Sequence, residues 1–325
     1  MKKRRLGQTD MYVNPVGLGC MGFSHAYGKA KDKDIAIGLL RDAHKLGYDF
    51  YDTAECYTGI CSDGSTSYNE ELVGEAIKDF RNEVIVATKF GVKHKGSYLE
   101  LDSSKDAIIS AINGSLKRLN VDCIDLYYQH RIDPKVEPEA VAEVMKELIK
   151  EGKIKAWGIS ETNEEYLRRA HSVCKVTAIQ NRYSMMARWY ENLFTVCEEL
   201  NISYVAFSPI ANGLLSGKYT NETKFLDGDF RNNMPQYSES GYEKAKDLLK
   251  LLEEISKEKN STMAQISLAW MMGKNKNIIP IPGSTNLSRL KENFDSSSIE
   301  LSKEEIKKID CLLEKMSFEV FGGNK

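Results

Sequence analysis

The segment Cys123-Ile-Asp-Leu-Tyr-Tyr128 is a short run rich in apolar and aromatic residues that leads directly into the polar cluster Gln129-His130-Arg131. A run of this length and composition predicts a buried strand. Comparable runs predict seven further strands, over 16–18, 48–51, 84–87, 156–159, 177–179, 203–207 and 278–281. Longer segments separate these runs, which is the pattern of repeated βα units.

The separating segments carry the apolar spacing of amphipathic helices. Apolar residues recur every three or four positions over 141–149 and again over 108–119, and a shorter stripe covers 72–77. The second stripe follows Ser103 and Ser104, and either hydroxyl is a suitable N-cap. One face of each helix would therefore be buried against the strands.

Eight such units in 325 residues fit an α/β fold of the (β/α)8 TIM barrel type. No linker or change in composition divides the chain, so we expect a single domain over residues 1–325. Three segments exceed the minimal repeat. They predict an N-terminal β-hairpin over the barrel bottom (1–13), a long loop followed by a helix (211–240 and 244–255), and an extra C-terminal helix (302–316).

Composition excludes several functional classes. The chain has 45 Lys and Arg against 47 Asp and Glu, which leaves a net charge of −2 and argues against a nucleic-acid partner. No apolar run is long enough to cross a membrane, and the basic start MKKRR lacks the apolar segment of a secretory signal. We therefore expect a cytoplasmic protein without membrane partner, either a monomer or a weak homo-oligomer.

The seven cysteines are odd in number, widely scattered and without a C-x-x-C pair. This spacing indicates reduced thiols, mostly buried, and neither a disulfide framework nor a metal site.

The stretch Gly17-Leu-Gly19-Cys-Met-Gly22 matches the dinucleotide-binding motif G-x-G-x-x-G. That motif needs a strand before it and a helix within it, but Pro15 interrupts the strand and no helical stripe begins before about Ile35. The glycines fit better as a strand exit where the backbone passes close to another element. A Rossmann dehydrogenase remains an alternative, and it would require the cofactor phosphates to lie at these glycines.

Chemically reactive or polar side chains follow the predicted strands at their carboxyl ends. Those ends meet at one rim of a barrel, where barrel enzymes keep their chemistry. Successive members lie 20 to 41 residues apart, close to one βα unit, so the fold would make them neighbours. They are Asp52, Lys89, His130, Ser160, Gln180 and Ser208.

These motifs resemble those of the aldo-keto reductase superfamily, specifically its bacterial and plant NADPH-dependent members. The resemblance covers nearly the whole chain and rests on Tyr51-Asp-Thr-Ala-Glu55 with Tyr57, Ala87-Thr-Lys-Phe-Gly91, Tyr128-Gln-His-Arg-Ile-Asp133, Gly158-Ile-Ser-Glu161 and Ile281-Pro-Gly-Ser284. It implies reduction of small aldehydes or ketones to alcohols, with NADP(H) bound across the barrel rim and a small-molecule carbonyl compound as partner.

The resemblance assigns catalysis to Asp52, Tyr57, Lys89 and His130. Tyr57 would be the general acid, and Lys89 would bring its pKa, near 10 in a free tyrosine, towards neutrality. Asp52 would keep Lys89 charged and oriented, and His130 would hydrogen-bond the substrate carbonyl.

The resemblance also assigns the cofactor contacts. Ser160 and Gln180 would bind the nicotinamide carboxamide, and Phe207 would stack on the nicotinamide ring. Ser208 and the segment Ile210 to Lys218, with Gly213 and Ser216, would wrap the pyrophosphate. Ser284 and Arg289 would hold the 2′-phosphate, Glu292 and Asn293 would contact adenine, and Gly22 and Gly283 would line the site. Some members have Lys at the position of Gly283, which would weaken the hold on the 2′-phosphate here.

For the substrate pocket we expect contributions from the loops near Tyr27, Phe90 and Trp189, the long loop, the tail 318–325 and the stretch 58–67.

A second functional class stays open, namely a slow-turnover redox-sensing NADP(H)-binding subunit resembling potassium-channel beta subunits. A stoichiometric membrane partner with negligible turnover would favour that alternative.

Overall fold

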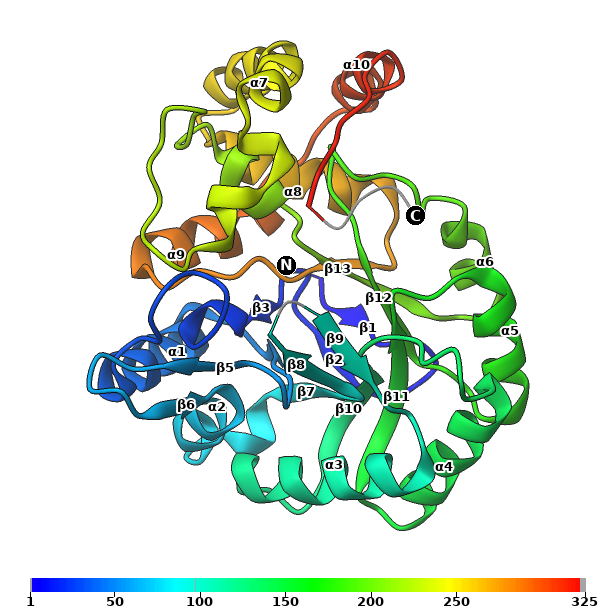
Figure 1. Ribbon diagram of the computed structural model, residues 1–325. Coiled ribbons are helices and arrows are strands. Elements are labelled where there is room, and N and C mark those ends of the chain that lie inside the picture. The colour runs from blue at the N-terminus through cyan, green and yellow to red at the C-terminus, as the bar shows by residue number, and fades with distance from the viewer. Residues whose placement is uncertain (1, 97, 322–325) are drawn as a thin grey trace.

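Eight parallel strands form one curled sheet in the structure, a computed structural model that describes residues 2–96 and 98–321 (Figure 1). In spatial order they are β3 (Leu18–Gly19), β4 (Phe50–Asp52), β7 (Ile85–Phe90), β10 (Ile124–Gln129), β11 (Ile154–Ser160), β12 (Ala178–Arg182), β13 (Ser203–Phe207) and β14 (Ile278–Pro280). The backbone N–H of Gly17 donates to the Pro280 carbonyl at 3.0 Å, which joins the first strand to the last. The sheet is therefore a (β/α)8 barrel, as the sequence predicts, and the Rossmann alternative is wrong.

The helices surround the strands on the outside of the barrel (Figure 1). They are α1 (Lys33–Leu46), α2 (Asn69–Ile77), α3 (Lys105–Leu119), α4 (Pro138–Lys150), α5 (Glu164–Val173), α6 (Leu193–Glu199), α8 (Met263–Lys274) and α9 (Leu287–Asp295). The three predicted stripes lie in α4, α3 and α2, and Ser104 is the cap of α3, since its side chain accepts from the Ala107 N–H. The amphipathic spacing thus predicted these helices correctly.

The barrel interior is filled by side chains that include Phe50, Leu126 and Ile279. The N-terminal hairpin, β1 (Arg4–Arg5) paired with β2 (Tyr12–Val13), adds Leu6 and Val13 to this cluster. The Gly7 N–H also donates to Oγ of Ser203, the first residue of β13, at 2.9 Å. The hairpin therefore closes the amino ends of the strands, as predicted, and leaves the opposite rim for chemistry.

Two further helices, α7 (Glu239–Glu258) and α10 (Lys303–Leu313), pack against α8 outside the ring (Figure 1). Both were predicted. The long loop before α7 is built of three short 3-10 turns, namely η3 (Ala211–Ser216), η4 (Phe230–Asn233) and η5 (Pro235–Tyr237). Further 3-10 turns lie at η1 (Met21–Phe23), η2 (Arg81–Glu83) and η6 (Ser296–Ser298).

Two small antiparallel hairpins stand on the catalytic rim. The first, β5 (Thr58–Ile60) with β6 (Thr66–Tyr68), follows β4, and the second, β8 (Val92–Lys95) with β9 (Tyr98–Leu101), follows β7. Neither hairpin was predicted, because their strands are only three or four residues long and carry few buried side chains.

All seven cysteines are free thiols, and Cys20, Cys56, Cys174 and Cys197 are buried. None of the helices in the described part of the chain combines the length and apolarity that a membrane span requires.

Candidate active site

The carboxyl ends of the strands open into a cavity of about 760 Å³, which is within the range of small-molecule sites. Asp52, Tyr57 and His130 line this cavity. Lys89 lies beneath them and is completely buried. The structure therefore brings together the four residues to which the sequence assigned catalysis.

Lys89 is the centre of this cluster. Its Nζ donates to Oδ1 of Asp52 at 2.5 Å, to the carbonyl of Thr53 at 2.8 Å and to Oη of Tyr57 at 3.3 Å. The other carboxylate oxygen of Asp52 accepts from Nε2 of Gln180 at 2.6 Å. Burial by itself would lower the pKa of Lys89, but the charge of Asp52 and the hydrogen bonds of Asp52 and Tyr57 raise it above its ordinary value. The ammonium therefore stays charged in a buried position.

Tyr57 differs from the sequence-based prediction in its protonation. Burial of the phenol raises its pKa to about 12, although the charge of Lys89 acts in the opposite direction. Lys89 thus lowers this pKa, as predicted, but it does not bring it towards neutrality, because the loss of hydration outweighs the effect of the ammonium. At neutral pH the hydroxyl keeps its proton, and that is the form a proton donor requires.

His130 is held as a neutral ring. Burial and the nearby charges of Arg131 and Lys89 hold its pKa well below the ordinary value. Its Nδ1 lies 3.4 Å from Sγ of Cys56, and burial raises the pKa of that thiol to about 12. The thiol therefore keeps its proton, and a hydrogen bond that it donates to Nδ1 would leave the ring proton of His130 on Nε2. His130 also meets the ring of Tyr57 edge-on, with centroids 5.7 Å apart.

The residues predicted to bind the cofactor all line the same cavity. They are Gly22, Ser160, Gln180, Phe207, Ser208, Ile210, Gly213, Ser216, Lys218, Gly283, Ser284, Arg289, Glu292 and Asn293. They come from the ends of β3, β11, β12, β13 and β14, from the long loop and from α9, so the cavity runs across the rim.

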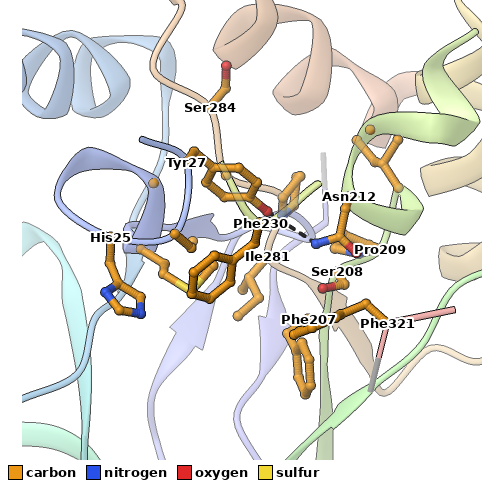
Figure 2. A pocket seen from close by; sticks show the side chains of 18 of the residues that line it. His25, Tyr27, Phe207, Ser208, Pro209, Asn212, Phe230, Ile281, Ser284 and Phe321 are labelled. Carbon is orange, nitrogen blue, oxygen red and sulfur yellow. Dashed lines mark hydrogen bonds between the residues drawn. The ribbon is translucent and has the colours of Figure 1, made fainter. Parts of the chain in front are cut away.

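The loop after β13 has an unusual backbone. Ser208, Ala211 and Asn212 have positive φ values of 52°, 46° and 58°, and Gly213 follows at 105°. Residues other than glycine are strained in this left-handed region, and such strain concentrates at functional sites. Asn212 holds this loop in part, because its Nδ2 donates to Oη of Tyr27 at 3.2 Å (Figure 2). Tyr27 lies in the loop after β3.

The end of the cavity near α9 carries a cation without a counter-ion. Nη1 of Arg289 donates to Oη of Tyr219 at 2.6 Å, and no carboxylate among the described residues forms an ion pair with it. Lys218, in contrast, pairs with Glu292 at 2.9 Å. A Cβ at Gly283 would lie 2.6 Å from the Gly19 carbonyl, so the closure of the barrel leaves no room for a longer residue there.

The structure corrects part of the predicted substrate pocket. Tyr27 lines the cavity, together with Phe230 of the long loop and Phe321 of the tail, while tail residues 322–325 lie outside the described residues (Figure 2). Phe90 does not line the cavity, because its ring packs outside the barrel against Tyr127.

Two more expectations about the pocket are wrong. Trp189 lies away from the cavity, against Tyr190. The stretch 58–67 also stays outside, because hairpin β5–β6 packs behind the loop after β3, where Nδ1 of His25 contacts the Thr58 carbonyl at 2.8 Å.

The sequence did not assign roles to Cys56, Arg131, Arg182 and His94, all of which line the cavity. Arg131 lies in the motif that begins at Tyr128, which places it near the rim, but spacing does not show which side chains meet there. Within residues 2–96 and 98–321, no group of three or more His, Cys, Asp or Glu is arranged to hold a metal ion.

The comparisons with known proteins agree with the fold. The Aldo/keto reductase family model matches residues 15–314. Aldo-keto reductase str7 of Strobilurus tenacellus is 36% identical over an alignment that covers 96% of this chain and 91% of that protein. The probable aldo-keto reductase 1 of Glycine max is 33% identical, and the alignment covers 94% of this chain and 87% of that protein. Among solved structures, the glycerol dehydrogenase of Gluconobacter oxydans is 25% identical, with a TM-score of 0.86 over 97% of this chain and 95% of that one.

The chain therefore belongs to the aldo/keto reductase family. As a member it is an oxidoreductase that depends on NAD(P)H.

Proposed function

We propose that this protein uses NADPH to reduce small aldehydes or ketones to alcohols, with Tyr57 as the general acid. The observation that carries the proposal is the contact of Oη of Tyr57 with Nζ of Lys89 at 3.3 Å, beside the neutral ring of His130 on the same cavity wall. A proton donor, a buried cation and a hydrogen-bond donor thus lie together.

When bound, the reduced nicotinamide supplies the hydride. In this proposal Tyr57 supplies the proton to the carbonyl oxygen, and Lys89 stabilises the phenolate that remains. Nε2–H of His130 orients the carbonyl and supports the negative charge that develops on its oxygen. Asp52 and Gln180 hold Lys89 in place through the carboxylate they share.

The residues around the cavity suit a dinucleotide with an additional phosphate. Ser160 and Gln180 would hold the carboxamide, and the face of Phe207 would support the ring. The strained loop with Ser208, Ile210, Gly213, Ser216 and Lys218 would follow the pyrophosphate.

At the opposite end, Arg289 offers a planar set of donors without an acidic partner in the described chain, and Ser284 lies on the same wall. This chemistry fits a 2′-phosphate and favours NADPH over NADH. Glu292 and Asn293 would contact adenine.

The test is a fluorescence titration with NADPH and NADH, followed by NADPH oxidation with a panel of small aldehydes and ketones. We expect tighter binding of NADPH and turnover of several carbonyl compounds. Glycerol is included in the oxidative direction, because a structural relative is a glycerol dehydrogenase. Tight binding of NADPH with no turnover of any compound would contradict the proposal and favour the slow redox-sensing subunit.

A further inference from the structure

Arg182, the last residue of β12, is a buried cation whose guanidinium is not bonded to any carboxylate of the described residues. Its exposed fraction is 8%, and it lines the cavity. Its guanidinium makes neither a hydrogen bond nor an ion pair within the described chain, and it lies over the rings of Phe207 and Phe321 at 4.9 and 5.9 Å from their centroids. A buried charge without a partner is costly, so the position is explained if an anion binds there.

Arg131 is a second cation on the same wall. Its Nη1 donates to the carbonyl of His130 at 2.6 Å and to Oγ of Ser160 at 3.2 Å, and its guanidinium lies 5.9 Å from the ring of Phe207. No ion pair to Arg131 is formed by the residues that the structure describes. Both arginines therefore approach one aromatic ring, next to the catalytic histidine.

The carboxylates near this wall are already engaged. Of the described residues that line the cavity, only Asp52 and Glu292 are acidic. Asp52 is bound by Lys89 and Gln180, and Glu292 by Lys218 and Thr262.

Glu161 is near enough for its charge to act on the Arg182 guanidinium, but it forms no ion pair with that group and does not line the cavity. One of its oxygens accepts from the backbone N–H of Arg182 at 3.2 Å, and the other from Oη of Tyr190 at 3.4 Å. The two guanidinium groups therefore keep donors for a group that enters the cavity.

We propose that Arg182, together with Arg131, forms an anion subsite that selects small aldehydes or ketones carrying a carboxylate. This inference rests on the proposed function, because it places the carbonyl at Tyr57 and His130. The guanidinium of Arg131 folds back onto His130, where its Nη1 donates to the carbonyl at 2.6 Å, so the carboxylate would lie only a few bonds from the substrate carbonyl. The ring of Phe321 would contact the short alkyl chain that joins the carbonyl to the carboxylate.

The experiment compares 4-oxobutanoate with its methyl ester, which has the same aldehyde and no charge. We expect a kcat/KM at least 10-fold higher for the acid, and a preference that weakens with added NaCl. Arg182→Met should raise the KM for the acid about 10- to 100-fold and leave the kinetics of the ester within threefold. Arg182→Lys, which keeps a charge but not the planar fork, should lie between them.

Arg168→Met is the matched control, because Arg168 is an arginine on the outer surface at α5 that pairs with Glu199. This control also removes one positive charge, and it should leave the kinetic constants for the acid and for the ester unchanged. Equal use of acid and ester by the unaltered protein would overturn the inference. So would equal losses for both in Arg182→Met, or a loss of NADPH affinity, since Arg182 would then serve the cofactor.

Failure of the proposed function can be distinguished from failure of the subsite, because neither the acid nor the ester would then be reduced. The subsite is tested separately by calorimetric titration of 4-oxobutanoate into the protein with NADP⁺ present, because the oxidised cofactor cannot reduce the aldehyde. Binding that weakens at least 10-fold in Arg182→Met supports the subsite, and binding that is absent or unchanged contradicts it.

Discussion

Replacing Lys89 with methionine removes the buried ammonium and keeps a side chain of similar length. Nζ of Lys89 lies 3.3 Å from Oη of Tyr57. At this distance and an effective dielectric constant near 20, the ammonium favours the phenolate by about 5 kcal/mol. If about half of that charge has developed in the transition state, the barrier to reduction rises by about 2.5 kcal/mol, which lowers kcat by roughly 10²-fold.

The same substitution leaves Asp52 buried with only the amide of Gln180 as its donor. Loss of one partner from a buried ion pair costs about 3 to 5 kcal/mol of folding stability. The double variant Lys89→Met with Asp52→Asn removes both charges, so its melting temperature should recover most of this loss.

The assay is steady-state NADPH oxidation with one good aldehyde, alongside thermal unfolding of each variant. We expect the double variant to recover stability without recovering kcat. A single variant that keeps kcat within threefold of the unaltered protein would refute the electrostatic role of Lys89, and so would a double variant that regains activity.

Three further predictions concern other residues of the site. Burial raises the pKa of Glu55 from 4.5 to about 7, so the folded protein binds this proton more tightly than the unfolded chain. This contribution to stability is fully present below about pH 4.5 and is lost as the pH rises through about 7, so Glu55→Gln should flatten the dependence of melting temperature on pH between 5 and 8. Arg289→Met should raise the Kd of NADPH about 10- to 100-fold and that of NADH less than twofold, as measured by fluorescence titration. Cys56→Ala removes the donor to Nδ1 of His130 and should lower kcat several-fold in steady-state assays, whereas Cys56→Ser should keep most of the activity.

The strands were predictable because each is a short apolar run buried by the barrel and its helices. The prediction was least accurate at their ends: the run 16–18 predicts a strand that the structure places at Leu18–Gly19, where it pairs with β4. Hairpin β8–β9 gave no such signal. Only its base is buried, where Val92 and Leu101 join a small apolar cluster, and the rest is held by backbone pairing.

The catalytic cluster could be predicted because its members follow successive strands, whose carboxyl ends meet in any barrel of this kind. The protonation of Tyr57 could not be predicted from the sequence, since it depends on how completely the phenol is buried. The same holds for Arg182, because a missing partner becomes visible only when the side chains around it are placed.

The central claim is that Tyr57 donates the proton in carbonyl reduction. It is tested most directly by the single-turnover rate of NADPH consumption with one small aldehyde, for the unaltered protein and for Tyr57→Phe. The substitution removes the phenolic hydroxyl and leaves Lys89 bound to Asp52 and Thr53, so the protein should stay folded and bind NADPH with unchanged affinity. We predict a rate at least 10²-fold lower in Tyr57→Phe, and a rate within twofold of the unaltered protein would contradict this assignment.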